Sequence, residues 1–445
     1  MNSGPQHQAP AKPTFREALG FWARLGFISF GGPAGQIAIM HTYLVERKRW
    51  ISDSRFLHAL NYCMILPGPE AQQLATYIGW LLHGRWGGIA AGMLFVLPSM
   101  FILLGLSIVY VTYGSLPWVA ALFTGSKPAV IAIVIVALFK IGKKSLLAPF
   151  HWVVAVGAFL CIFFFHVPFP LIILGAITMA ALLARVAPAM LAIKEKTSAA
   201  KKADEAGYYL NSESAVAGGH LAWHQAILRP AMVGLMLWGL PFAALLWLAS
   251  DPAFWRTLSL FFTQAALVTF GGAYAVLPYV AQVSVEQLGW LSSAQMMDGL
   301  ALGETTPGPL IMVLAFVGFM AGNNHFNGSL AMGSLALGVT TYYTFLPSFL
   351  FIFAGAPLIE RTRDNVKLKA ILALVTAAVV GVVLNLTIYL GKAVLFPVDT
   401  SMKGLDLIAL AWVVISFIAL YRFKANMIAW LGISSLFGLV VYLLC

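Results

Sequence analysis

The sequence predicts an all-α polytopic membrane protein with two inverted-topology repeats of broken or re-entrant helices, joined by a polar linker and one extra transmembrane helix. Two observations predict this fold. The composition is that of a membrane protein, since 60% of the 445 residues are hydrophobic and 10% are charged, whereas a soluble domain carries roughly 25% charged residues. In addition, the helix-breaking motifs of the first half recur in the second half.

Each half contains a Phe-Gly-Gly motif and a Pro-Gly-Pro motif inside a long apolar stretch. Phe30 and Phe270 open the first motif, Pro67 and Pro307 open the second, and both pairs are 240 residues apart. A Leu-Pro-Ser triplet at Leu97 recurs 249 residues later, so we infer a short insertion in the second copy. Paired interrupted segments in two halves of a membrane protein are the best sequence indication of a transport site.

The order of segments along the chain follows from polarity. We expect a cytoplasmic tail at 1–17, a first repeat at 18–192, a polar cytoplasmic linker at 193–228, a connecting transmembrane helix at 229–250 and a second, inverted repeat at 251–445. The tail lacks the apolar core and the cleavage site of a signal peptide. The first repeat contains two interrupted segments and then four apolar segments, at about 18–44, 56–82, 87–113, 127–144, 151–165 and 168–186.

The positions of Lys and Arg indicate that the two copies have opposite orientations. Basic residues concentrate in cytoplasmic loops. The first copy has three successive basic residues at 47–49, whereas the counterpart at 287–289 has none, and no Lys or Arg occurs between Arg256 and Arg361. Conversely, the uncharged loop of the first copy at 114–126 corresponds to a basic loop in the second. The connecting helix supplies the odd crossing that inverts the second copy.

The same rule applies to the two interrupted segments of the first copy. The tail, the loop at 47–49 and the turn at Arg85 are all basic. If all three are cytoplasmic, each interrupted segment enters the membrane, turns at its break and returns. Non-helical backbone at membrane depth is tolerated only inside protein or along a cavity, so both breaks would lie in the interior. The alternative is that both segments span the membrane and the loop is an exception to the rule.

We expect the breaks to form an anion-binding site. A helix that begins at mid-membrane presents about half a positive charge and several unpaired N–H groups. Four such N-termini aimed at one point would bind an anion. The expected substrate-binding residues are Arg24, Ser29, Phe30, Gly31, Gly32, Gln36, Pro67, Gly68, Pro69, Gln72, Gln73, Thr269, Phe270, Gly271, Gly272, Thr305, Thr306, Pro307, Gly308 and Pro309. The alternative is that Gly and Pro only permit close helix packing.

Charged residues near the breaks are candidates for coupling or gating, because burying an ionisable group in a bilayer costs at least about 2.5–3.5 kcal/mol. The expected coupling or gating residues are Glu70, Glu304, Arg49 and Arg85. For Glu70, the alternative is a carboxylate that stabilises its own helix N-terminus. For Arg49, the alternative is that its charge serves only as a topology signal that marks the cytoplasmic side. The position of Arg24 is occupied by neutral Gln264 in the second copy. We therefore expect Arg24 either to attract the substrate or to extend to the cytoplasmic surface.

Other functional classes lack support in the sequence. We find no phosphate-binding loop, dinucleotide fingerprint, zinc-binding helix motif or serine-hydrolase motif. Cys63, Cys161 and Cys445 show no paired spacing, so neither a disulfide framework nor a metal site is expected. The net charge of +11 arises from short loops between apolar segments and does not indicate nucleic-acid binding. We expect a non-enzymatic protein of the lipid bilayer without a cofactor.

The first-copy motifs resemble those of the chromate ion transporter family of chromate resistance proteins. The resemblance lies in Phe30-Gly31-Gly32-Pro33, Gln36-Ile37-Ala38, Arg49-Trp50 and the run Leu66-Pro67-Gly68-Pro69-Glu70-Ala71-Gln72-Gln73-Leu74-Ala75. It covers essentially the whole chain outside the tail and linker. The second-copy motifs are weaker, because Ala273 replaces Pro33 and Leu310 replaces Glu70.

The resemblance implies a secondary transporter that exports chromate from the bacterial cytoplasm across the inner membrane, with the N-terminus cytoplasmic. Sulfate is the structural analogue, since a tetrahedral oxyanion dianion makes the same demands with sulfur or chromium at its centre. One alternative is therefore a carrier of sulfate or another oxyanion. A second is an intramembrane enzyme acting on lipid, which would need a polar catalytic cluster. The oligomeric state is left open, a homodimer included.

The opposite orientation of the copies can be tested by labelling single cysteines. In a chain without the three native cysteines, Lys48→Cys and Leu288→Cys should react with an impermeant thiol reagent from opposite sides of the membrane, because these loops are equivalent in the two copies. Labelling of both from the same side would exclude the inverted arrangement.

Overall fold

The computed structural model describes residues 10–30, 32–64, 66–186, 207–211, 223–270, 272–359, 366–396 and 404–444. Within these ranges the chain is almost entirely helical, and the β contact is one isolated bridge between Ile51 and Leu210. Six of the described helices are long and apolar enough to span a membrane. The chain is therefore an all-α polytopic membrane protein, as predicted.

The first half consists of seven helices and one π-helical turn. In order these are α1 (Phe15–Ile28), α2 (Gly32–His41), η1 (Thr42–Arg47), α3 (Asp53–Cys63), α4 (Glu70–Tyr113), α5 (Pro117–Ser145), α6 (Pro149–Phe165) and α7 (Phe169–Val186). Helix α4 is two helices joined by a kink at His83 and Gly84, where the backbone leaves helical geometry. The predicted breaks therefore separate α1 from α2 and α3 from α4.

The second half repeats this order after one additional helix. Its elements are α8 (Trp223–Leu248), α9 (Pro252–Leu267), α10 (Ala273–Ala281), η4 (Gln282–Gln287), α11 (Ser293–Thr305), η5 (Leu310–Met312), α12 (Val313–His325), α13 (Leu330–Ile359), α14 (Val366–Leu395), α15 (Leu407–Tyr421) and α16 (Met427–Leu444). The π-helical turns η1 and η4 are 240 residues apart. Because π-helices are rare, their recurrence shows that the copies share backbone geometry as well as motifs. Helix α8 begins within the range expected for the linker.

Each interrupted segment of the first half folds back on itself. Lys48 Nζ donates to Glu17 Oε1 at 2.7 Å, so the chain leaves the first hairpin beside the point where it enters. His83 Nε2 lies 2.9 Å from Pro13 O, which brings the end of the second hairpin to the same place. The two breaks are therefore the tips of hairpins whose ends share one side of the protein.

The second half forms the equivalent hairpins. Asp251 caps α9, and its Oδ2 lies 2.8 Å from His325 Nε2 at the end of α12. The hydrogen bond from His325 lowers the pKa of the Asp251 carboxyl. Asn324 Nδ2 donates to Trp290 O at 2.8 Å, which ties the loop after η4 to the same end.

One stretch of the linker docks on the first half. Ser52, the N-cap of α3, donates its N–H to Leu210 O at 2.8 Å. In the second half, the N-cap Ser292 donates its N–H to the side chain of Gln295, in a capping box. Arg55 stands at the equivalent position of the first half. The linker therefore supplies the acceptor that this N-cap lacks.

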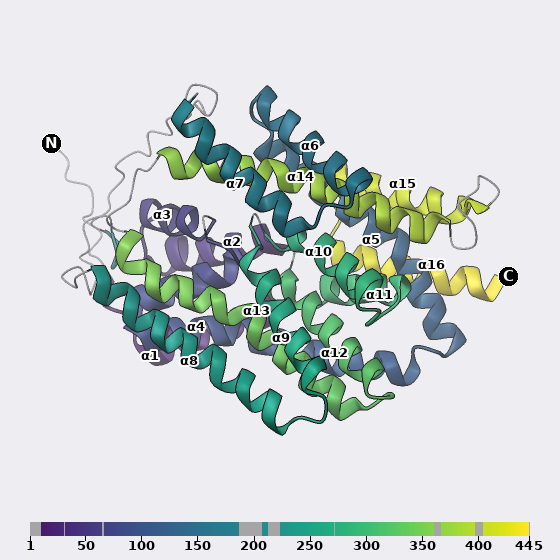
Figure 1. Cartoon of the computed structure of the whole chain (residues 1–445), viewed down its shortest axis with the longest axis horizontal. Coiled ribbons are helices and arrows are strands. Elements are labelled where there is room, and N and C mark those ends of the chain that lie inside the picture. Colours follow the sequence, from purple (N-terminus) through teal and green to yellow (C-terminus); the bar gives the residue numbers. More distant parts are fainter. Residues whose placement is uncertain are drawn as a thin grey trace.

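The last three helices of each half form a bundle in which partners are exchanged (Figure 1). Helix α5 packs against α15 and α16 of the other half, α14 packs against α6 and α7, and α5 and α14 contact each other. The hairpins form the second group, in which α1 packs on α4, α9 packs on α13, and α4 contacts α13. Helix α8 lies against α9 and α13. Neither half therefore completes its packing without the other.

Two glycines allow backbone contact between α5 and α16 in the bundle. A Cβ on Gly438 would lie 2.5 Å from Gly125 Cα and would also meet Ala121 O. Small residues at such crossings let transmembrane helices approach closely.

We expect Gly438→Ala to destabilise the protein by about 1–3 kcal/mol, because the added methyl group overpacks the contact. Gly432→Ala is the matched control, because Gly432 lies on the same helix and a Cβ there would have no atom within 4 Å. Thermal unfolding of the purified protein in detergent measures the difference. An equal loss of stability in both variants would contradict the role of this crossing.

Candidate functional site

The helix breaks of the two halves meet, and reciprocal hydrogen bonds join them. The N–H of Gly68 donates to Thr269 O at 2.7 Å, and the N–H of Gly308 donates to Ser29 O at 2.8 Å. Each bond joins the Pro-Gly-Pro tip of one half to the residue that precedes Phe-Gly-Gly in the other half. A pseudo-two-fold axis between the halves produces reciprocal contacts of this kind.

The two tips accept only glycine at their centre. Gly68 and Gly308 have positive φ angles of 128° and 99°, which side chains rarely adopt. A Cβ on Gly68 would lie 2.7 Å from Gln73 Nε2, and one on Gly308 would lie 2.6 Å from Ser99 Cβ. Both conformation and space therefore require glycine where the tip approaches the other half.

A helix begins directly after each break. Helix α2 starts at Gly32, α4 at Glu70, α10 at Ala273, and the short η5 leads from Leu310 into α12. The first turn of a helix carries unpaired N–H groups and a partial positive charge. The breaks are therefore lined by donors from four helix N-termini, which suits an anion.

Polar side chains are buried around these N-termini. Those buried are Ser29, Gln36, Gln72, Gln73, Thr269 and Thr306. Gln36 Nε2 donates to Gly308 O at 2.5 Å and to Ser29 O at 3.3 Å, so it reinforces one reciprocal contact. The hydroxyls of Ser29 and Thr269 donate to carbonyls one turn back, Leu25 O and Ala265 O. In this conformation Gln36 joins the breaks of the two halves, and the two hydroxyls bond within their own helices.

Two serines at the tips were not predicted as site residues. Ser99 of α4 and Ser348 of α13 are completely buried, and their hydroxyls have no hydrogen-bond partner among the described residues. A Cβ on Gly308 would meet Ser99, and one on Gly68 would meet Ser348. A buried hydroxyl without a partner is costly, so it needs an explanation. We assign both hydroxyls to the candidate site as donors for a bound anion.

The sequence did contain a signal for these serines. Each belongs to the Leu-Pro-Ser triplet that recurs at an offset of 249 residues, which served only to align the two copies. The triplets lie in uninterrupted apolar segments, and nothing local indicates that each reaches the tip of the opposite half.

The other predicted residues fall into three groups. Buried or half-buried at the breaks are Phe30, Gly32, Pro67, Pro69, Phe270, Gly272, Thr305, Pro307 and Pro309. Gly31 and Gly271 lie outside the described residues. Arg24 lies on the exposed face of α1 with Phe27 and Ile28, whereas Ser29 is buried. This placement fits an arginine that extends to the surface.

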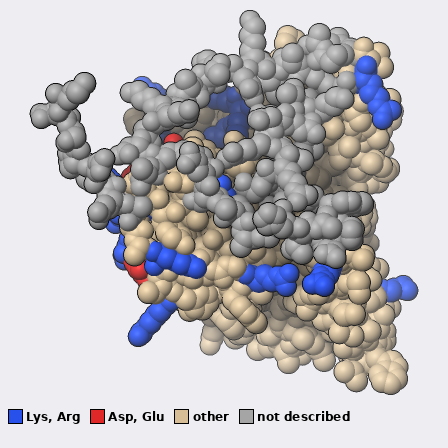
Figure 2. All heavy atoms as spheres, turned by 90° about the vertical axis from the view of Figure 1, so that its left-hand side faces the viewer, with Lys and Arg blue, Asp and Glu red and all other residues tan. Residues whose placement is uncertain are grey.

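The predicted coupling or gating residues occupy different surroundings. Tyr274 of α10 donates to Glu304 Oε1 of α11 at 2.7 Å, which links the two hairpins of the second half. Glu70 is half-buried and opens α4. Arg49 has a left-handed backbone in the loop after η1, and Arg85 is exposed just after the α4 kink. Figure 2 shows Lys and Arg around the end of the molecule where α3 lies in Figure 1.

A buried ion pair connects the hairpins to the bundle, and the sequence did not indicate it. Asp298 Oδ1 of α11 lies 3.5 Å from Lys127 Nζ of α5, and their side chains are 8% and 19% exposed. Tyr110 of α4 donates to Asp298 Oδ2 at 2.9 Å. Removing one partner of such a pair leaves an uncompensated charge. The pair therefore restrains α11 relative to α5.

Comparison with known proteins gives one consistent result. The family model described as chromate transporter matches residues 16–183 and 256–439. The chain is 29% identical to the chromate transport protein of Cupriavidus metallidurans over 92% of this chain and 90% of that protein. It is 29% identical to the chromate transport protein of Pseudomonas aeruginosa over 97% and 94%. It is also 27% identical to an uncharacterized transporter of Methanocaldococcus jannaschii over 94% and 92%. No solved structure matches.

We expect Ser99→Ala and Ser348→Ala each to weaken oxyanion binding. A hydrogen bond to a charged group contributes about 1.5–3 kcal/mol, so the dissociation constant for sulfate should rise about tenfold or more. Calorimetric titration of the purified protein with sulfate measures this change. Ser107→Ala is the control, because Ser107 is buried in α4 but donates to Leu103 O. Unchanged affinity in both tip variants would remove these serines from the site.

Proposed function

The chain belongs to the chromate transporter family, and we propose that it is a secondary transporter that exports chromate across the bacterial inner membrane and so confers chromate resistance. The observation that carries this proposal is the reciprocal pair of hydrogen bonds between the Pro-Gly-Pro tips and the opposite halves. The names of the two chromate transport proteins similar to this chain support chromate as the substrate.

The anion would bind by exchange of hydrogen-bond acceptors. In this conformation the N–H groups of Gly68 and Gly308 donate to Thr269 O and Ser29 O. An anionic oxygen is a stronger acceptor than an amide carbonyl, so chromate can take over these donors together with the first-turn N–H groups of the four helices. A tip that releases its carbonyl partner separates from the opposite half. We assign this separation to the opening step of transport.

The two-fold relation between the halves gives an economical route for alternating access. One reciprocal bond lies at each tip, and the two bonds are equivalent. We propose that the Gly68 contact opens for access from one side of the membrane and the Gly308 contact for access from the other. Transporters built from inverted repeats work by such alternating movement around a fixed central site.

Hairpin ends support an opposite orientation of the halves. In the first half the ends carry Lys48, Arg49 and Arg85, whereas in the second half they carry one arginine, Arg256, beside Asp251 and His325. Since basic residues mark the cytoplasmic side, we propose that the first-half hairpins re-enter from the cytoplasm and those of the second half from the other side. The N-terminus, beside the first hairpins, is then cytoplasmic.

The membrane potential is a sufficient driving force for export. Moving one charge across 100 mV releases about 2.3 kcal/mol, so a dianion leaving a negative interior releases about 4.6 kcal/mol. Neither an antiported anion nor a symported proton is required. We propose that Glu304, bound to Tyr274, and Glu70, at the start of α4, act on the tips as gates. When ionised, either carboxylate opposes a dianion at the breaks.

Sulfate is the second candidate substrate, because the site offers N–H and O–H donors to the oxygens and no feature that recognises the central atom. The relative rates for chromate and sulfate therefore decide between a chromate exporter and a general oxyanion carrier.

Everted membrane vesicles test the proposal. Radiolabelled chromate should accumulate inside vesicles that contain the protein, and an imposed potential, positive inside, should increase the uptake. Gly68→Ala and Gly308→Ala should each lower the rate about tenfold or more, since a left-handed alanine costs roughly 1–2 kcal/mol before the clash is counted. The matched control is Gly105→Ala on α4, because a Cβ added at this position would have no atom within 4 Å.

Two results would count against the proposal. Uptake of sulfate without uptake of chromate would identify a different carrier. Full transport by both tip variants would show that the breaks serve packing and not substrate binding.

A further inference from the structure

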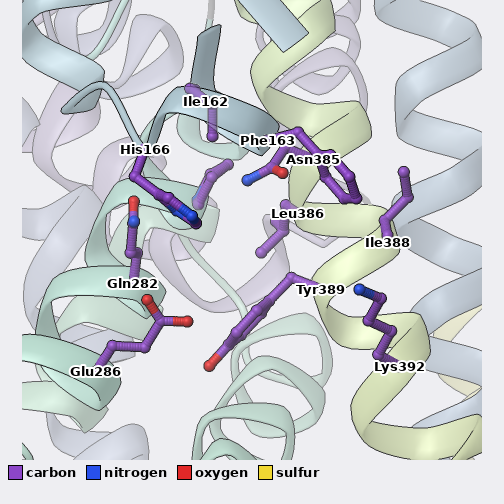
Figure 3. Close-up of a pocket in the computed structure, with 11 residues that line it drawn as sticks. Ile162, Phe163, His166, Gln282, Glu286, Asn385, Leu386, Ile388, Tyr389 and Lys392 are labelled. Atoms are coloured by element: carbon purple, nitrogen blue, oxygen red, sulfur yellow. The ribbon is translucent and has the colours of Figure 1, made fainter. Parts of the chain in front are cut away.

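A cavity of about 200 Å³ lies between α6, α14 and the segment formed by α10 and η4. Its polar lining residues are His166, Gln282, Glu286, Asn385, Tyr389 and Lys392. Figure 3 shows His166, Gln282 and Glu286 on one wall, and the α14 residues Asn385 and Tyr389 facing them across the open space. The cavity thus lies where the second-half hairpin meets the bundle.

The polar groups face the cavity instead of pairing with each other. Among the described residues, Tyr389 is the one of the six whose side chain makes a hydrogen bond, with Ser293 Oγ at 3.2 Å. The ammonium of Lys392 lies 5.4 Å from the centre of the Phe163 ring, and no ion pair joins it to Glu286. The side chains of Lys392, Gln282 and Asn385 and the ring N–H of His166 are therefore available as donors.

Both copies have a lysine at the position of Lys392. Lys143 precedes it by 249 residues and lies 5.1 Å from the Tyr421 ring, an arrangement equivalent to that of Lys392 and Phe163. Under the proposed orientation, Lys392 is on the extracytoplasmic side, where topology disfavours Lys and Arg. A cation kept there and directed into a polar cavity needs a reason other than topology.

The cavity also adjoins the predicted route of the substrate. Its lining includes Pro278, six residues after Gly272 on α10, a distance of about 9 Å along a helix. Glu286 and Gln282 lie on η4, and π-helical turns occur frequently at functional sites. The cavity therefore lies along the same α10–η4 segment that begins at the break of the second half.

We propose that this cavity is a second oxyanion subsite, through which the substrate passes on release from the central breaks. Lys392, with Gln282, Asn385 and His166, binds the tetrahedral oxyanion. Glu286 on the same rim repels it and keeps the binding weak. A transport pathway needs a site that the ion enters readily and also leaves. This inference rests on the proposed function.

The proposal predicts opposite effects for two neighbouring charges. Lys392→Gln should weaken oxyanion binding in the cavity about tenfold or more, because a charge-assisted hydrogen bond is lost. Glu286→Gln should strengthen it about threefold or more, because a like charge is removed. Arg256→Gln, which removes an exposed cation outside the cavity lining, should leave it unchanged.

Protection of a cysteine from labelling measures this binding. Ile388 lines the cavity without being one of the proposed donors, so Ile388→Cys is placed in the full chain with the native cysteines replaced by serine. The protein is held in nanodiscs of zwitterionic lipid and labelled with N-ethylmaleimide at increasing sulfate, with chloride of equal ionic strength as reference. At twice the dissociation constant, sulfate should slow labelling about threefold, since the unbound fraction falls as 1/(1 + [L]/Kd).

Each outcome decides the proposal. Protection that persists in Lys392→Gln, or is lost equally in Arg256→Gln, overturns the subsite. Protection in nanodiscs of anionic lipid without sulfate overturns the assignment to a free anion and identifies a lipid phosphate as the ligand. Chromate transport by the parent protein without protection overturns this inference alone, whereas protection without chromate transport overturns the proposed function.

Discussion

The need to satisfy broken backbone inside a membrane governs this structure. A helix that stops at mid-membrane leaves backbone N–H and C=O groups without hydrogen-bond partners, because lipid tails offer none. Here the N–H of each Pro-Gly-Pro glycine donates a hydrogen bond to a carbonyl of the opposite half. The accepting residue is the one that directly precedes the Phe-Gly-Gly motif. Each half thus completes the backbone of the other, and in the bundle α5 and α14 also pack against helices of the opposite half.

The bonds that stabilise the breaks also hold their N–H donors in fixed positions. Donors paired with neutral carbonyls are held in position, and a stronger acceptor can replace those carbonyls. A site of this kind is closed without substrate and needs no positively charged side chain at its centre. Arg24 lies on the exposed face of α1, so the positive character of the breaks comes from helix N-termini and hydroxyl groups.

The two halves share a backbone but differ in chemistry. The N-cap of α3 receives its acceptor from the linker, whereas the N-cap of α11 receives it from Gln295. Asp298 of the second half pairs with Lys127 of the first half, and His58 stands at the first-half position equivalent to Asp298. The equivalent hairpins are therefore held in place by different contacts in the two halves.

The sequence by itself determined the fold class, the duplicated unit and the positions of the breaks, because apolar length, Gly and Pro act locally on the chain. The tertiary structure alone decided which breaks pair, since each bond joins residues about 200 or more positions apart whose approach depends on packing. It brought Ser99 and Ser348 to the tips and placed Arg24 on an exposed helix face. The face of an uninterrupted apolar helix that meets a given tip follows from the packing of all its neighbours, and no local pattern encodes it.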